Sequence, residues 1–182
     1  MSGFFGIYRR DGAVVERRDL SCMGSMLAHR GDRSELHIDG AIGLGARTLI
    51  TTPEQQGELN PLKAGTIVLA ADARIDNRDE LFNALGYGGA DRKQLGDVAL
   101  IAHAFRKWGE DCVEHLVGDF AFAIWNEADQ SLYCARDRMG VRPLYYYVSD
   151  SLFAFASEIK SLFCLHDVPR DIDDMRVASH LL

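Results

Sequence analysis

The sequence lacks both long hydrophobic runs and an excess of basic residues. No apolar segment approaches the ~20 residues that a helix needs to cross a bilayer. Lys and Arg total 20 against 27 Asp and Glu, which leaves a net charge of -7. Binding to nucleic-acid phosphates requires a basic face, so we expect neither a nucleic acid nor a membrane as a partner. The N-terminus also lacks the apolar core of a secretory signal, so we expect a cytoplasmic protein.

Cysteine is scarce as well, and the cysteines are far apart. The chain has four, with no CxxC pair: Cys22, Cys112, Cys134 and Cys164. Zinc sites and disulfide frameworks show closer and more regular spacings. We therefore expect no metal in this domain and no disulfide framework, and we interpret the thiols as small core side chains.

What the sequence does contain is enough apolar material for one core. Its 182 residues are 47% hydrophobic, which suits a single domain. The first seven residues, Met1 to Ile7, predict a buried strand that starts at the chain end itself. Phe4, Phe5 and Ile7 favour a strand, while Gly3 and Gly6 permit close backbone approach.

Ser2 gives this terminal strand a chemical interest. Removal of Met1 would leave Ser2 with a free α-amine beside its own hydroxyl, which places a general base and a nucleophile on one residue. This is the arrangement of N-terminal nucleophiles. The alternative is that Ser2 is an ordinary second residue before a strand.

Hydrophobic periodicity predicts an α+β chain with strands at both ends. Helices are expected over residues 19–29, 77–85, 97–108 and 110–116. Strands are expected over 34–38, 41–50, 66–71, 119–126, 131–136, 144–148 and 152–156, with a short return strand at Val14-Val15. Residues 51–65 are interpreted as a loop, Asp72 is expected to leave the sheet, and Gly88-Gly89 to act as a connector. This order suggests two antiparallel sheets between helices.

Three segments resemble the amidotransferase domain of glutamine-dependent asparagine synthetases. They are Gly118 to Trp125 (GDFAFAIW), Ala135 to Tyr146 (ARDRMGVRPLYY) and Phe155 to Lys160 (FASEIK). The further markers of that family fall at His29-Arg30-Gly31, Arg47, Ile75, Asn77 and Asp97. The resemblance implies an N-terminal-nucleophile (Ntn) hydrolase fold, a four-layer α/β/β/α sandwich of two antiparallel sheets.

The resemblance also implies partners and cofactors outside this domain. Such a domain hydrolyses glutamine and passes ammonia to a C-terminal synthetase domain that uses ATP and Mg. We expect residues 1–165 to form the amidotransferase-like domain and residues 166–182 to begin a linker toward a synthetase domain. A separate synthetase protein, glutamine and a second copy of the chain, as a homodimer, are the other candidate partners.

The expected active site departs from the family in three places. The family nucleophile is a cysteine, where this chain has Ser2. The family's Asn-Gly pair donates hydrogen bonds to the oxyanion and its Glu binds the substrate ammonium, where this chain has Asp72, Ala73 and Arg74. An ionised Asp72 only accepts hydrogen bonds, and losing one oxyanion donor typically lowers turnover about 100-fold to 1,000-fold.

Other family positions allow two interpretations. Arg47 could still hold a carboxylate and Asp97 an ammonium, or Arg47 could form an internal ion pair with Asp72 or Asp97. We expect Asp137, Arg138 and Arg142 to stabilise a tight turn. The side chains of His29 and His103 are expected to pack on helices.

Three hypotheses follow for the activity. The first is an amidotransferase-like domain without glutaminase activity that keeps a structural role, as in asparagine-synthetase-like peptide cyclases or β-lactam synthetases. The second is an active amidase that uses Ser2. The third is an asparagine synthetase domain with an engineered nucleophile, which the changes at Asp72, Ala73 and Arg74 disfavour.

Overall fold

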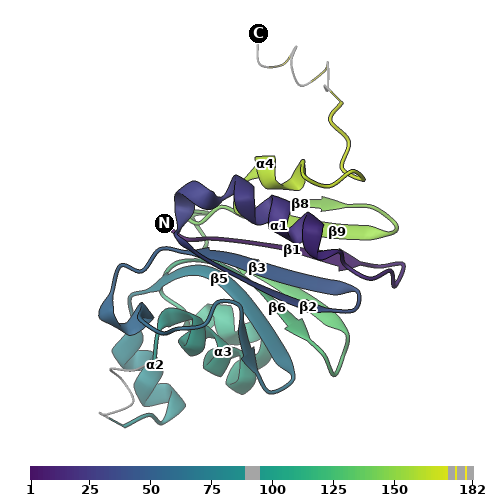
Figure 1. Ribbon diagram of the computed structural model, residues 1–182. Helices are drawn as coiled ribbons and strands as arrows, with labels where there is room; N and C mark the ends of the chain where they lie inside the picture. The colour runs from purple at the N-terminus through teal and green to yellow at the C-terminus, as the bar shows by residue number, and fades with distance from the viewer. Residues whose placement is uncertain (89–94, 172–174, 176–178, 180–182) are drawn as a thin grey trace.

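The computed structural model describes residues 1–88, 95–171, 175 and 179, and it has two antiparallel sheets between two helical layers (Figure 1). One sheet has the strand order β2-β3-β1-β9-β8: Arg33–Asp39, Ile42–Thr48, Gly3–Arg9, Leu152–Ala156 and Tyr145–Val148. The other has the order β4-β5-β6-β7: Leu62–Ala64, Ile67–Ile75, Gly118–Asn126 and Ser131–Arg136. The predicted α+β class and four-layer α/β/β/α order are confirmed.

Figure 1 shows which helices cover which sheet. Helices α1 (Arg17–Met26) and α4 (Ile159–Leu162) lie on the five-stranded sheet, while α2 (Arg78–Leu85) and α3 (Asp97–Trp108) lie on the four-stranded sheet. A 3₁₀ helix over Gly109–His115 follows α3, where the sequence predicted a short helix. The layer order is thus helices, sheet, sheet, helices.

Strand β1 occupies the middle of the five-stranded sheet, as the apolar terminal segment predicted. It pairs antiparallel with β3 on one side and β9 on the other. Phe4 faces the opposite sheet, whereas Phe5 and Ile7 face α1. A Cβ on Gly6 would lie 2.4 Å from the Phe155 ring, so this glycine is required for close packing. The chain end is therefore held inside the fold.

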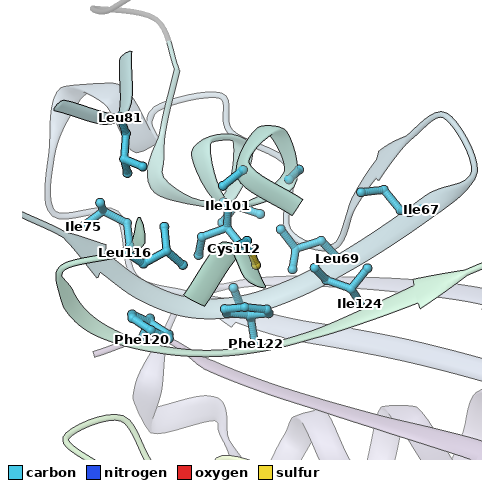
Figure 2. Packing of buried hydrophobic residues seen from close by; sticks show 14 residues of the cluster. Ile67, Leu69, Ile75, Leu81, Ile101, Cys112, Leu116, Phe120, Phe122 and Ile124 are labelled. Atoms are coloured by element: carbon cyan, nitrogen blue, oxygen red, sulfur yellow. The ribbon is translucent and has the colours of Figure 1, made fainter. Parts of the chain in front are cut away.

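Alternation along the strands divides the core into layers. Ala121, Ala123 and Trp125 of β6 pack between the two sheets. Their neighbours Phe120 and Phe122 point to the other face, toward α3, together with residues of β5 and the following helices (Figure 2). Strand β5 is covered on both faces, as its nearly continuous apolar sequence predicted.

The structure corrects the expectation that the chain leaves the sheet at Asp72. Strand β5 continues to Ile75, and Asp72 and Arg74 remain paired with Ala121 and Asp119 of β6. Ladder hydrogen bonds with β6 keep these residues extended although their side chains are polar. Three of the candidate site residues, Asp72, Ala73 and Arg74, therefore lie on a paired strand.

Smaller corrections concern loops and helix ends. Val14-Val15 forms no strand: the Val15 amide donates to the Gly40 carbonyl at 2.9 Å. Helix α1 begins at Arg17, so Asp19 lies in its first turn and does not cap it, and the helix ends at Met26. The loop over 51–65 contains a 3₁₀ helix, Pro53–Gln55, and strand β4. Of the predicted Gly88-Gly89 connector, Gly89 lies outside the described residues.

Candidate active site

A cavity of about 250 Å³ opens at the N-terminal end of β1. It collects residues from segments far apart in the sequence: Met1, Ser2, Leu49, Thr51, Thr52, Gln55, Asp72, Ala73, Arg74, Asp97 and Arg142. The structure thus brings together all but one of the predicted site residues. Arg47 is the exception among the described residues.

Ser2 is half-buried and directly precedes β1. Its Oγ accepts a hydrogen bond from the Leu49 amide at 3.1 Å, and its carbonyl accepts one from Arg30 Nε at 2.8 Å. Among the described residues, no side-chain base is hydrogen-bonded to this hydroxyl. With Met1 in place, the nitrogen of Ser2 is a peptide amide and is no base either.

Asp72 is the most deeply buried charged group in the cavity, with 3% of its surface exposed. Arg30 Nη2 lies 3.4 Å from its Oδ2, and Arg142 Nη1 lies 3.3 Å from its Oδ1. Burial raises the pKa of this carboxyl, while the two arginines and the terminal amine oppose that shift. The carboxylate of Asp72 is therefore held between two cations.

Arg30 connects Asp72 to a second acid, Glu158. Arg30 Nη1 donates to Glu158 Oε1 at 2.9 Å, and Glu158 also contacts His29 and Lys160. Burial opposes ionisation of Glu158, but the hydrogen bonds from Arg30, Lys160 and His29 lower its pKa to about 2. We call Arg30, Asp72, Arg142 and Glu158 the charged cluster.

The local sequence explains how Arg30 reaches this position. It ends the 3₁₀ helix Ala28–Arg30 that follows α1. A Cβ on Gly3 would lie 3.0 Å from Arg30 Cδ, so the small residue in β1 leaves room for the arginine stem. Although the resemblance includes the His29-Arg30-Gly31 marker, sequence reasoning assigned Arg30 no role. The expectation that His29 packs on a helix is wrong, because it is 54% exposed and pairs with Glu158.

Ala73 and Arg74 lie at the rim of the cavity. The side chain of Arg74 is 69% exposed, and its Nε lies 3.0 Å from Asp76 Oδ1. A surface pair of this kind contributes little to stability. Arg74 is thus free to reorient, whereas Asp72 is not.

Asp97 begins α3 and closes another side of the cavity. Its carboxylate pairs with Arg78 of α2, which also donates to the Leu95 carbonyl. Burial raises the pKa of Asp97, and the nearby Arg78 opposes the shift. Sequence reasoning missed Arg78, which belongs to no quoted motif.

Glu58 supports the same end of α3. Its Oε1 accepts the amide hydrogen of Ala99 at 3.0 Å, so a carboxylate from a distant loop binds the N-terminal turn of the helix. Burial, with a further contribution from Asp97, raises the pKa of Glu58 to about 7. Its position in a loop between Gly57 and Leu59 provided no sequence signal.

Arg47 points away from the cavity. Its Nε donates to the Gly24 carbonyl of α1 at 2.9 Å. The predicted ion pair of Arg47 with Asp72 or Asp97 is wrong, because those acids pair with Arg30, Arg142 and Arg78. On β3, Ala46 faces the other sheet, so strand alternation directs Arg47 toward α1.

The turn between β7 and β8 is partly as predicted. Asp137 accepts the amide hydrogens of Val141 and Arg142, both at 2.9 Å, which stabilises the turn. Arg142 differs from the prediction because its side chain lines the cavity. Its Nε and Nη1 are buried and have no hydrogen-bond partner among the described residues. His103 lies within α3, and its ring contacts Tyr87, whose Oη is hydrogen-bonded to His103 Nδ1 at 2.9 Å.

The part of the chain that the structure describes has no group of three or more His, Cys, Asp or Glu side chains placed to hold a metal ion. All four cysteines are free. Cys112 is buried as predicted, and the other three are half-buried.

None of the described helices is long and apolar enough to cross a membrane.

Comparisons with known proteins identify the family of this chain. The "Glutamine amidotransferase domain" family model matches residues 1–182. "Asparagine synthetase [glutamine-hydrolyzing] 3" of Bacillus subtilis is 32% identical over 165 residues, which cover 88% of this chain and 27% of that protein. The asparagine synthetase of Zea mays is 32% identical over 155 residues, covering 82% of this chain and 26% of that protein.

Solved structures show the same fold. The glutamine phosphoribosylpyrophosphate amidotransferase of B. subtilis, complexed with ADP and GMP, superimposes with a TM-score of 0.69 at 18% identity. The match covers 89% of this chain and 43% of that one. The chain spans about a quarter of the curated relatives named above. A family match over every residue, together with this fold, shows that the chain belongs to the glutamine amidotransferase domain family.

Proposed function

We propose that this domain, of the type found at the N-terminus of asparagine synthetases, has no glutaminase activity and serves as a structural unit for an ATP-dependent amide-forming domain. The observation that supports this most is Asp72, held between Arg30 and Arg142 where the family resemblance places an oxyanion donor. A carboxylate at that position repels the negative charge of the tetrahedral intermediate.

The substrate side of the cavity supports the same conclusion. Binding of the glutamine ammonium needs an acidic acceptor, but Arg74 replaces the family's glutamate. The remaining acid, Asp97, already pairs with Arg78. Freeing Asp97 would leave Arg78 without its carboxylate, which is costly for a group only 26% exposed.

The lengths of the asparagine synthetase relatives support a proposal about the partner of this domain. Since this chain matches about a quarter of each named asparagine synthetase, we infer a synthetase-like domain or protein as its partner, with residues 166–182 as the linker. ATP and Mg would bind to that partner. The amidotransferase fold would then contribute its surface to the assembly.

A glutaminase assay tests the proposal. Glutamate formation from glutamine is measured for wild type, for Ser2→Cys, and for the quadruple variant Ser2→Cys, Asp72→Asn, Ala73→Gly, Arg74→Glu. Wild type and Ser2→Cys should show no turnover, because each remaining defect costs about 100-fold or more. Glutamate formation should appear only in the quadruple variant. Ordinary turnover by wild type would contradict the proposal.

One observation favours the second hypothesis, an amidase that uses Ser2: the residue lines the cavity and its Oγ already accepts an amide hydrogen. Intact-mass measurement after treatment with a glutamine-analogue electrophile separates the two. The structural role predicts no adduct. Stoichiometric labelling of Ser2 would instead support the amidase.

A further inference from the structure

The acidic groups of the cavity have little capacity left for a ligand. Asp72 has cations on both sides, Arg30 at 3.4 Å and Arg142 at 3.3 Å. Asp97 pairs with Arg78 and also accepts a backbone hydrogen bond from Ile75. A ligand ammonium would have to displace one of these arginines and leave it partly buried without its carboxylate.

The basic groups, in contrast, have donors to spare. Arg142 is only 12% exposed, and its contact with Asp72 is an ion pair without hydrogen-bond alignment. A guanidinium has five N–H donors, and the Nε and Nη1 groups of Arg142 are shielded from solvent and have no hydrogen-bond partner among the described residues. A rotation of the side chain would turn these unused donors toward a ligand in the cavity. At the rim, the one ion pair of the Arg74 side chain within the described residues is its solvent-exposed pair with Asp76.

Size limits the ligand as well. The cavity volume of about 250 Å³ is below the range of about 300–1,000 Å³ typical of sites for drug-sized molecules. The hydroxyl of Ser2 and the polar side chains of Thr51, Thr52 and Gln55 line the same space. The ligand is therefore small and polar.

We propose that this cavity binds a small oxyanion, a carboxylate compound without an α-ammonium group, with Arg142 as its main partner and Arg74 at the rim. The inference rests on the proposed function, since a cavity that no longer processes glutamine is free to hold another ligand. Asp72 then has a positioning role, because its ion pair keeps Arg142 at the cavity wall, while Arg30 on its other side offsets its repulsion of the ligand anion. Arginine suits this task since its planar donors match a carboxylate.

Glutamine and 4-carbamoylbutanoate make a matched pair of probes, since they differ only in the α-ammonium group. Isothermal titration calorimetry at low ionic strength should show that 4-carbamoylbutanoate binds at least about tenfold more tightly than glutamine. Inorganic phosphate forms a third arm that tests whether any oxyanion suffices or a carboxylate is required. Saturable binding of 4-carbamoylbutanoate supports the proposal, whereas binding of phosphate alone or of neither oxyanion overturns it.

Variants identify the residue responsible. Arg142→Gln should weaken binding about tenfold to a hundredfold, the effect of one charge-assisted hydrogen-bonded pair. Arg138→Gln is the matched control. Arg138 is exposed, and its substitution removes the same charge four residues away. Equal affinities for the two variants would overturn the assignment, as would glutamine binding as tightly as its deaminated analogue.

A second variant keeps the test decisive if Arg142→Gln fails to fold. Arg74→Gln alters an exposed side chain, so it should fold normally and weaken 4-carbamoylbutanoate binding severalfold. Unchanged affinity in a folded Arg74→Gln would then contradict the proposal. The glutaminase assay fails or succeeds independently, since it follows glutamate release and this experiment follows equilibrium binding of a ligand with no α-amine.

Discussion

The interior between the two sheets and the charged cluster beside the cavity are both buried, yet different forces hold them. Between the sheets, Phe4, Trp125 and Phe155 pack with small and aliphatic neighbours and are no more than 2% exposed. In the charged cluster, Asp72 is just as inaccessible but depends on Arg30 and Arg142 for compensation. Apolar burial is favourable with any well-fitting neighbour, whereas a buried charge requires one particular partner.

This difference decides how each region responds to the loss of one side chain. A buried ion pair contributes little net stability compared with apolar packing, but removal of one partner is strongly destabilising. Once Asp72 is present, Arg30 and Arg142 are required as well. The charged groups of the cavity are thus needed for one another.

The largest expected effect is on the apolar side of the comparison. Phe155→Ala should lower the free energy of unfolding by about 3–5 kcal/mol, because it leaves a void between the sheets. Its ring lies 5.8 Å from that of Phe4, centroid to centroid. Urea denaturation followed by tryptophan fluorescence measures the change. A loss below about 1 kcal/mol would show that this interior is loosely packed.

Arg30→Met tests the charged cluster through the same quantity, the free energy of unfolding. We expect a loss of about 3 kcal/mol, since the variant leaves Asp72 and Glu158 short of a cation and removes a hydrogen bond to the Ser2 carbonyl. Arg18→Met is the matched control, because Arg18 pairs with Glu16 and Asp19 but is 83% exposed. Equal urea midpoints for the two variants would mean that burial does not decide the cost.

Because of Glu58, we expect the free energy of unfolding to depend on pH, an effect that the apolar interior cannot produce. Its pKa rises from 4.5 to about 7 on folding, so the folded state binds the proton more tightly. The contribution of Glu58 to the free energy of unfolding should therefore be fully present below about pH 4.5 and should be lost, by about 3 kcal/mol, as the pH rises to 7.

The difference between wild type and Glu58→Gln isolates this contribution, since other titrating groups are common to both. Denaturation curves between pH 4.5 and 8 should diverge as the pH falls below 7, with wild type relatively more stable at the acid end. Glu114→Gln, at an exposed position, serves as the control and should run parallel to wild type. Parallel curves for Glu58→Gln would contradict the prediction.

The smallest effect is expected at the rim of the cavity. Arg74→Gln should change the free energy of unfolding by less than about 0.5 kcal/mol, because its pair with Asp76 is exposed to solvent. Urea denaturation at low and high salt measures it. A loss comparable to that of Arg30→Met would show that the charged cluster extends to the rim.

Much of the fold could be predicted because strand and helix periods are local properties. The predictions of 131–136 and 152–156 as strands and of 97–108 as a helix match β7, β9 and α3. The end of β5 could not be predicted: a polar Asp72 suggests that a strand has ended, and only pairing with β6 keeps it extended. The same holds for β4, a three-residue strand that exists through its partner β5.

The candidate site divides in the same way. The sequence by itself determined the layer order and the buried terminal strand, and its family resemblance predicted that Ser2, Asp72 and Arg74 replace the nucleophile, the oxyanion donor and the ammonium ligand. Only the tertiary structure decided which cations accompany those replacements. Arg30, Arg78 and Arg142 reach the cavity from three separate segments, and Arg47 turns toward α1. The physical reason is that apolar patterns repeat along the chain, whereas a buried charge is compensated by whichever opposite charge the fold brings within about 4 Å.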